Sequence, residues 1–184
     1  GAVAAAEILF GDVAPSGRLP FTWPRATGQS PLSYDLPPTS RPASAQDRWT
    51  NRYLDLPPEP RYPFGHGLTT SPVDYADPIL DRPQASVADT VTVRVAVTNR
   101  GTRGVREVVQ LYARDLLASR ARPDRRLVAF EPVEIEPGRT REVALEVRVA
   151  DLGFHVENGH WVVEPGVFRF FAGPDARATR AVDL

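Results

Sequence analysis

Apolar and polar residues alternate along much of the second half of the chain. The alternation is clearest in two segments, whose apolar positions are Val91, Val93, Val95 and Val97, and Val143, Leu145, Val147 and Val149. A period of two residues places such side chains on one face of a β-strand whose other face is polar. Between the two segments, Val108 to Ala113 is a nearly continuous apolar run broken by Gln110, which is typical of a central strand.

Turn sequences punctuate these segments. Asn99-Arg100-Gly101 ends the first valine segment, and Glu136-Pro137-Gly138 and Glu164-Pro165-Gly166 occur further on. In a type II turn, proline presets the first central dihedral angle and glycine accepts the positive φ that follows. Further strands are predicted at Leu127 to Ile135, Glu142 to Val149, Val167 to Ala172 and Thr179 to Val182. Short strands separated by turns at this spacing predict an antiparallel β-sandwich.

The first 23 residues follow another pattern. Gly1 to Phe10 reads GAVAAAEILF, which is strong in helix propensity, and Gly11 is a natural C-terminal stop, so we expect a helix. Only Glu7 in it is polar, and a helix that is apolar on nearly all sides is normally buried. Arg18 to Trp23 is predicted to form a short edge strand. Because one helix and one strand cannot enclose each other, we expect this segment to belong to a larger α/β domain.

Between Pro24 and Pro78 the periodicity disappears, and 11 of the 19 prolines fall there. A stretch of this length without regular structure is normally either a disordered linker or an ordered strap laid over another surface. The strap is favoured because free linkers are poor in aromatic residues, whereas this connector contains Tyr34, Trp49, Tyr53, Tyr62 and Phe64.

Composition narrows the classes of function. With 22 basic and 23 acidic residues the formal net charge is −1, which gives no electrostatic reason to bind nucleic acid or an anionic membrane. The absence of cysteine excludes disulfides and thiolate metal sites. No apolar run approaches the length of a membrane span, and Gly1 to Phe10 lacks the features of a signal peptide. We expect no nucleic-acid partner, no membrane partner and no cofactor.

Several short motifs follow one another along the chain. They include FGDVAPSGRLPFTWP, GQSPLSY, RYPFGHGLTT, VAVTNRG, EVVQLYARD, LVAFEPVEIEPGRT and VEPGVFRFFAG. In this order the sequence resembles the C-terminal third of glycoside hydrolase family 3, and in particular its bacterial periplasmic or secreted β-glucosidases. The resemblance covers essentially the whole chain.

This resemblance implies a domain organisation. Residues 1–23 would be the last helix and strand of an α/β sandwich domain, residues 24–72 a proline-rich connector, and residues 73–184 a fibronectin type III-like (immunoglobulin-like) β-sandwich. The fold class is therefore expected to be mainly β. The resemblance also implies a periplasmic or secreted parent protein.

Members of this family hydrolyse glycosidic bonds with retention, using an aspartate nucleophile in an N-terminal barrel and a glutamate acid/base in the second domain. Two carboxyl groups are needed because one attacks the anomeric carbon while the other protonates the leaving oxygen. In the family both residues precede the stretch that this chain matches, so we assign no catalytic residue. The 184-residue chain alone is expected to be inactive, although its parent protein would be an enzyme.

Some residues are candidates for contact with a sugar or with a neighbouring domain. Aromatic rings suit pyranose faces and arginine suits sugar hydroxyls, which makes candidates of Arg41, Trp49, Arg52, Tyr53 and Tyr62. The same side chains could instead pin the connector to the other domains. His66, between Gly65 and Gly67, is either a substrate or interface imidazole or part of a tight turn. Family members often have an aromatic residue at this position.

Two other clusters carry weaker signals. His155, Glu157 and His160 have spacings that suit neither a helix face nor a strand face, and Asn158-Gly159 indicates a hairpin, so we expect no metal site. A basic loop contains Arg114, Arg120, Arg122, Arg125 and Arg126. It either contacts an acidic surface or an anionic polysaccharide, or is a solvated, partly paired loop.

The main hypothesis is that the chain is the C-terminal portion of a retaining β-glucosidase-like enzyme of carbohydrate catabolism, acting as a structural and interdomain module. Its partners would be the N-terminal barrel and the rest of the α/β sandwich domain, which would bind a β-glucoside or an oligosaccharide. The alternative is a stand-alone fibronectin-like module that binds polysaccharide or protein. In the alternative, the apolar side chains of residues 1–23 would lack cover.

Overall fold

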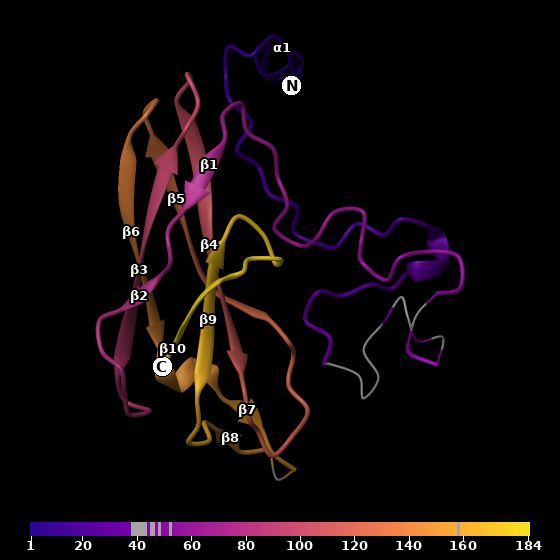
Figure 1. The fold of residues 1–184 in the computed structure, drawn as a ribbon, viewed down its shortest axis with the longest axis vertical. Coiled ribbons are helices and arrows are strands. Elements are labelled where there is room, and N and C mark those ends of the chain that lie inside the picture. The colour runs from indigo at the N-terminus through magenta and orange to yellow at the C-terminus, as the bar shows by residue number, and fades with distance from the viewer. Residues whose placement is uncertain (38–43, 45–46, 48, 52, 158) are drawn as a thin grey trace.

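The structure is a computed structural model of the 184-residue chain and describes residues 1–37, 44, 47, 49–51, 53–157 and 159–184. One helix and one 3₁₀ turn come first, and a series of strands follows (Figure 1). In chain order the elements are α1 (Ala2–Phe10), η1 (Thr27–Gln29), β1 (Val73–Tyr75), β2 (Ile79–Leu80), β3 (Thr90–Asn99), β4 (Val105–Asp115), β5 (Arg126–Ile135), β6 (Thr140–Arg148), η2 (Val149–Leu152), β7 (Phe154–His155), β8 (Trp161–Val162), β9 (Phe168–Gly173) and β10 (Arg180–Asp183).

The strands form two four-stranded sheets and one small hairpin. In the first sheet β3 pairs with β6 on one side and with β1 and β2 on the other, and the second sheet has the order β10-β9-β4-β5. The two sheets stack face to face, and the N-terminal region extends beyond them (Figure 1). The pairings are antiparallel. The predicted antiparallel β-sandwich is therefore confirmed.

The core lies between the two sheets. Val91, Val93, Val95 and Val97 of β3 are at most 1% exposed, as their alternation predicts. They meet apolar side chains of β4 and β9 that belong to the same cluster, such as Leu111 and Phe170. Strand β6 continues the pattern in register, because Val93 lies opposite Leu145 and Val95 opposite Val143.

Strand β4 is buried on both of its faces. Leu111 belongs to the core between the sheets, whereas Tyr112 points to the outer face of the second sheet and packs with Phe171 in a separate cluster. Tyr34 and Phe64 of the connector cover that cluster. The nearly continuous apolar run in the sequence thus reflects the sandwich core on one side and the connector on the other.

Helix α1 forms where predicted and ends at Gly11, whose φ of 81° is left-handed. The expectation that the helix is buried is not met within this chain, because none of its residues is buried. Val3 is 73% exposed, and Leu9 and Phe10 are each 83% exposed. Among the described residues, the structure contains no helix with both the length and the apolar character needed to span a bilayer.

The predicted edge strand at Arg18 to Trp23 is wrong as a regular strand. Residues 18–23 instead run beside residues 61–67 and make a single β-bridge, between Trp23 and Tyr62. Leu19 adds two backbone hydrogen bonds of 2.8 Å, because its N–H donates to the carbonyl of His66 and its carbonyl accepts from the N–H of Gly65. Pro20 and Pro63 lack the N–H groups that a continuous ladder needs. We call residues 18–23 and 61–67 together the junction ribbon.

Two turn predictions have different outcomes. Gly138 adopts a φ of 68°, as the Pro-Gly turn at Glu136 to Gly138 requires. Gly166 does not have a positive φ, so the second Pro-Gly sequence is not a type II turn. The expected hairpin after His155 is present as β7 and β8, with Gly159 at a φ of 75°. Asn158, the other residue of that signal, lies outside the described residues.

Candidate functional site at the junction of connector and sandwich

The junction ribbon meets the sandwich at Gly65. Its carbonyl oxygen accepts a hydrogen bond of 3.0 Å from Nε2 of Gln110 in β4, and Oε1 of Gln110 accepts one of 2.6 Å from the Tyr112 hydroxyl. Gly65 has a φ of 80°, and a Cβ atom there would lie 2.0 Å from Gln110 Oε1. Glycine is thus required both by the backbone conformation and by the close approach to β4.

His66 links the ribbon to the loop between β9 and β10. Its ring stacks on Tyr62 with centroids 4.9 Å apart, and its Nδ1 lies 3.6 Å from Oδ2 of Asp175. Asp175 is 7% exposed and also pairs with Arg177 at 3.3 Å. The structure therefore combines a tight turn at Gly65 with an imidazole that faces the sandwich, and a contact of His66 with substrate stays a prediction.

A buried carboxylate anchors the other strand of the ribbon. Glu107 of β4 is 2% exposed, and its Oε1 accepts hydrogen bonds of 2.8 Å from Arg18 Nη2 and from the Tyr75 hydroxyl. Burial, together with the adjacent Glu107 carboxylate, raises the pKa of Tyr75, so the phenol stays protonated and donates. This three-residue node joins the N-terminal segment to β1 and β4.

Aromatic stacking completes the junction. The rings of Tyr34 and Phe64 lie 4.1 Å apart and nearly parallel, and Tyr34 meets Tyr112 edge-on at 6.1 Å. The Tyr34 hydroxyl also accepts a hydrogen bond of 3.2 Å from the backbone N–H of Leu127. These contacts fasten the connector to the outer face of the second sheet at Tyr34 and Phe64.

The predicted contact residues are only partly brought together. Tyr62 and His66 stack on each other, whereas Trp49 is 70% exposed and Tyr53 is 37% exposed in the connector. Arg41 and Arg52 lie outside the described residues. The residues that sequence reasoning missed are Arg18, Tyr75, Glu107 and Asp175. The sequence offers one signal for this junction. Gln110 interrupts the apolar run from Val108 to Ala113, and Glu107 immediately precedes it.

The basic loop is paired within the chain. Arg122 Nη2 donates to the carbonyl of Leu152 at 2.9 Å, and the Arg125 guanidinium lies 3.9 Å from the centre of the Phe171 ring. The other three arginines pair with Asp124, Glu157 and the backbone of Asp151. The structure thus supports the interpretation of a partly paired loop.

The cluster of His155, Glu157 and His160 belongs to the β7–β8 hairpin. His155 Nδ1 lies 3.1 Å from the carbonyl oxygen of Gly159, and its ring meets Trp161 edge-on. Within the described part of the chain, no group of three His, Cys, Asp or Glu side chains is arranged to hold a metal ion.

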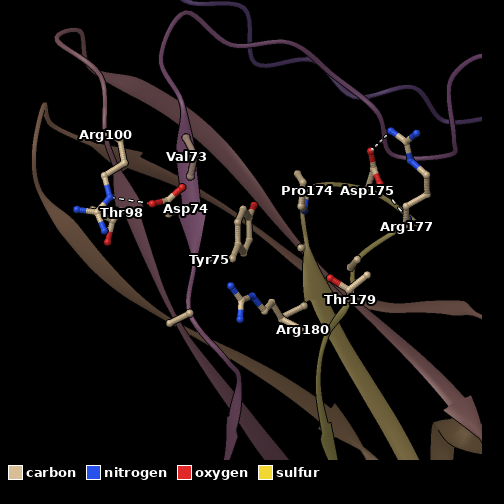
Figure 2. Close-up of a pocket in the computed structure, with 14 residues that line it drawn as sticks. Val73, Asp74, Tyr75, Thr98, Arg100, Pro174, Asp175, Arg177, Thr179 and Arg180 are labelled. Atoms are coloured by element: carbon tan, nitrogen blue, oxygen red, sulfur yellow. Dashed lines mark hydrogen bonds and ion pairs between the residues drawn. The ribbon is translucent and has the colours of Figure 1, made fainter.

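A groove of about 680 Å³ lies beside the junction, between β1 and the loop that joins β9 to β10 (Figure 2). Asp74 and Arg100 line one side, Asp175, Arg177 and Arg180 line the other, and Tyr75 stands between them. Asp175 thus takes part in both the junction and the groove.

The junction is built to hold segments together. A retaining glycosidase needs two carboxyl groups about 5 Å apart that flank the scissile bond. The buried carboxylates of the described residues, Glu107 and Asp175, are instead each paired with an arginine of this chain. Glu107 holds the N-terminal segment on the sandwich through Arg18, Asp175 faces His66 of the connector, and we assign neither carboxylate a role in bond cleavage.

Comparisons with known proteins agree with this organisation. Residues 1–70 match the model of the glycosyl hydrolase family 3 C-terminal domain, and residues 107–176 match the fibronectin type III-like domain. A periplasmic beta-glucosidase of Salmonella typhimurium is 37% identical over 96% of this chain, and a beta-xylosidase of Formosa agariphila is 35% identical over 95%.

Solved structures show the same fold. A β-glucosidase from Listeria innocua, in complex with glucose, matches 98% of this chain with a TM-score of 0.91 and 32% identity. A β-glucosidase from Erythrobacter marinus matches 98% with a TM-score of 0.88 and 40% identity.

These matches define a class of protein that combines a glycosyl hydrolase family 3 C-terminal domain with a fibronectin type III-like domain. The chain belongs to glycoside hydrolase family 3 and corresponds to the C-terminal part of its β-glucosidases. It spans about a quarter of the relatives' length, with 23% of the Salmonella protein and 25% of the Listeria chain covered.

Proposed function

We propose that this chain is the non-catalytic C-terminal portion of a retaining β-glucosidase-like hydrolase, in which it serves as an interdomain module. Residues 1–23 would complete an α/β sandwich domain, residues 24–72 would strap that domain to the sandwich, and residues 73–184 would form the fibronectin type III-like domain. The barrel and the α/β domain of the same protein would bind and hydrolyse a β-glucoside or oligosaccharide.

One observation carries this proposal. The sandwich has a complete core, whereas α1 exposes Leu9 and Phe10 at 83% each, and Phe21 and Trp23 are 48% exposed and stack on each other. An apolar surface of this kind on a folded protein normally marks an interface. Residues 1–70 match the glycosyl hydrolase family 3 C-terminal domain, and this chain covers only 23% of the Salmonella relative, so the occupant we propose is the rest of an α/β domain in the part of the protein that this chain does not cover.

The proposal extends to localisation. The Salmonella relative is named a periplasmic beta-glucosidase. This name supports a parent protein that acts on glucosides outside the cytoplasm. We propose export of the parent protein to the periplasm or the medium.

A chimera tests the interdomain role. The matching C-terminal segment of the Erythrobacter marinus β-glucosidase is replaced by this chain, to which it is 40% identical. We expect the chimera to hydrolyse an aryl β-glucoside and the 184-residue chain alone to have no activity. In the chimera, Leu9→Arg should lower activity at least tenfold, because the arginine would be buried without a partner.

The matched control is Glu7→Gln, a polar substitution on the same helix, which should leave activity unchanged. Hydrolysis by the isolated chain would contradict the absence of a catalytic pair. An inactive chimera, or a chimera that tolerates Leu9→Arg as well as Glu7→Gln, would contradict the interdomain role.

A further inference from the structure

We propose that the groove between β1 and the β9–β10 loop is a binding site for a neutral oligosaccharide. The groove is open to solvent and has a volume of about 680 Å³, which lies within the range of small-molecule sites in proteins. It is lined from both sheets, so its two sides are held apart by the sandwich itself (Figure 2).

The charges of the groove point to an uncharged ligand. Arg100 Nε lies 2.8 Å from Asp74 Oδ2, and Arg177 Nη2 lies 3.3 Å from Asp175 Oδ2. Arg180 pairs at 3.0 Å with Asp77, beside the groove. Each guanidinium is thus balanced by a carboxylate, and an anionic ligand would meet Asp74 and Asp175 as well as the arginines.

Paired arginine and aspartate side chains match the chemistry of sugar hydroxyls. A hydroxyl group both donates and accepts a hydrogen bond, so it can bond a carboxylate and a guanidinium at once. The Arg100–Asp74 and Arg180–Asp77 pairs are more than half exposed at every side chain, and such ion pairs contribute little to stability. A ligand can therefore exchange their mutual contacts for contacts with itself at little cost.

Tyr75 lines the middle of the groove with the part of its side chain that the sandwich core leaves uncovered. Its ring stands between the two sides, and Arg180 extends toward β1 beneath it (Figure 2). The hydroxyl donates to Glu107 at 2.8 Å, which fixes the ring before any ligand arrives. The uncovered part of this fixed ring, flanked by hydrogen-bonding groups, can contact the C–H groups of a pyranose at little entropic cost.

Titration of the full 184-residue chain with defined oligosaccharides tests the proposal. Neutral cellotetraose and laminaritetraose are compared with anionic tetragalacturonate, and binding is measured by chemical-shift changes in ¹⁵N-labelled protein. We expect saturable binding of a neutral oligosaccharide, with shifts at Tyr75 and Thr179. Asp74→Ala and Arg180→Ala should each weaken binding at least fivefold, because each removes a hydrogen-bonding group for the sugar hydroxyls. Both side chains are exposed, so their removal should leave the fold intact.

Arg94→Ala is the matched control. Arg94 forms an exposed ion pair with Glu142 on the first sheet, away from the groove, and its loss should leave binding unchanged. Absence of saturable binding to the neutral oligosaccharides overturns the proposal, as does binding of tetragalacturonate alone. Equal weakening by Arg94→Ala and Arg180→Ala would place the binding elsewhere and also overturn it. The chimera experiment measures hydrolysis and not binding in the groove, so its result tests the proposed function independently of this inference.

Discussion

A carboxylate occupies an inward-facing position at Glu107, where the alternation along β4 otherwise places apolar side chains such as Val105 and Val109. We predict that Glu107→Leu destabilises the chain by about 3–5 kcal/mol, because it leaves the mostly buried Arg18 and the Tyr75 hydroxyl without their partner. Urea unfolding measures the loss.

Two comparisons separate this effect from the general loss of a charge. Glu142→Leu removes an exposed ion pair with Arg94 and should cost about 0–1 kcal/mol. Adding Arg18→Met and Tyr75→Phe to Glu107→Leu should recover most of the stability, because no buried polar group of the node is then unpaired. A triple variant as unstable as Glu107→Leu alone would refute this account of the node.

Acid should destabilise the sandwich through a few carboxylates. Hydrogen bonds from the backbone of Thr92, the backbone of Ser86 and the side chain of Arg169 lower the pKa values of Asp81, Asp89 and Asp183, respectively. A group whose pKa is lower in the folded state stabilises the fold above its ordinary pKa, near 4, and loses that contribution as the pH falls through the lowered value.

We therefore predict that the urea midpoint is nearly constant from pH 7 to pH 5 and falls below about pH 4. Asp89→Asn should make this fall shallower, because asparagine does not titrate. Unchanged steepness in Asp89→Asn would show that Asp89 does not contribute.

At the scale of elements, the alternating strands could be predicted closely from the sequence. Period-two patterns are local and depend on one face being buried, so β3 and β6 were identified nearly to their ends. The very short strands β2, β7 and β8 have too few residues to show a period. Strand β2 was not predicted, and β7 and β8 were indicated only by the hairpin signal Asn158-Gly159.

The junction could not be predicted in the same way, because its contacts join residues far apart in the chain. Arg18 lies 89 residues before Glu107, and Gly65 lies 45 residues before Gln110. No local pattern encodes these pairings. The edge strand at Arg18 to Trp23 failed for a related reason, since its partner is a proline-containing connector segment and not a regular strand.

The junction ribbon depends on Gly65. We predict that Gly65→Ala destabilises the chain and loosens the connector, because the added methyl group meets Gln110 and Tyr112 while the φ of 80° strains any L-residue. The expected cost is about 2–4 kcal/mol, the sum of a backbone term and an overpacking term. Limited proteolysis should cleave the connector faster than in the unchanged chain.

Gly138→Ala is the matched control. Gly138 has a φ of 68°, but nothing lies within 4 Å of the position of an added Cβ, so only the backbone strain applies. We expect a cost of about 1 kcal/mol and no change in proteolysis of the connector. Equal effects of the two substitutions would show that the close approach to β4 is unimportant.

At the scale of the whole molecule, the sandwich contains its own core and should fold without residues 1–71. Deleting them should leave a cooperatively unfolding domain, because the cluster between the sheets comes from residues after Val73. Its stability should be lower by about 3 kcal/mol or more, since the buried Glu107 loses its partner Arg18 and Tyr112 loses the cover of Tyr34 and Phe64. A melting temperature equal to that of the full chain, by calorimetry, would contradict the strap's contribution.

The full chain, unlike the isolated sandwich, should self-associate. Its helix α1 exposes Leu9 and Phe10, whose burial against the rest of an α/β domain we propose, so copies of the isolated chain should associate through this surface. Leu9→Glu with Phe10→Glu should shift the chain toward monomer in light scattering and leave the melting of the sandwich unchanged. Leu117→Glu alters a residue that is 82% exposed on the sandwich, and association should persist in it. If Leu117→Glu abolished association and the helix variant did not, the chain would associate through the sandwich. That result would contradict the proposal that α1 is the interdomain face.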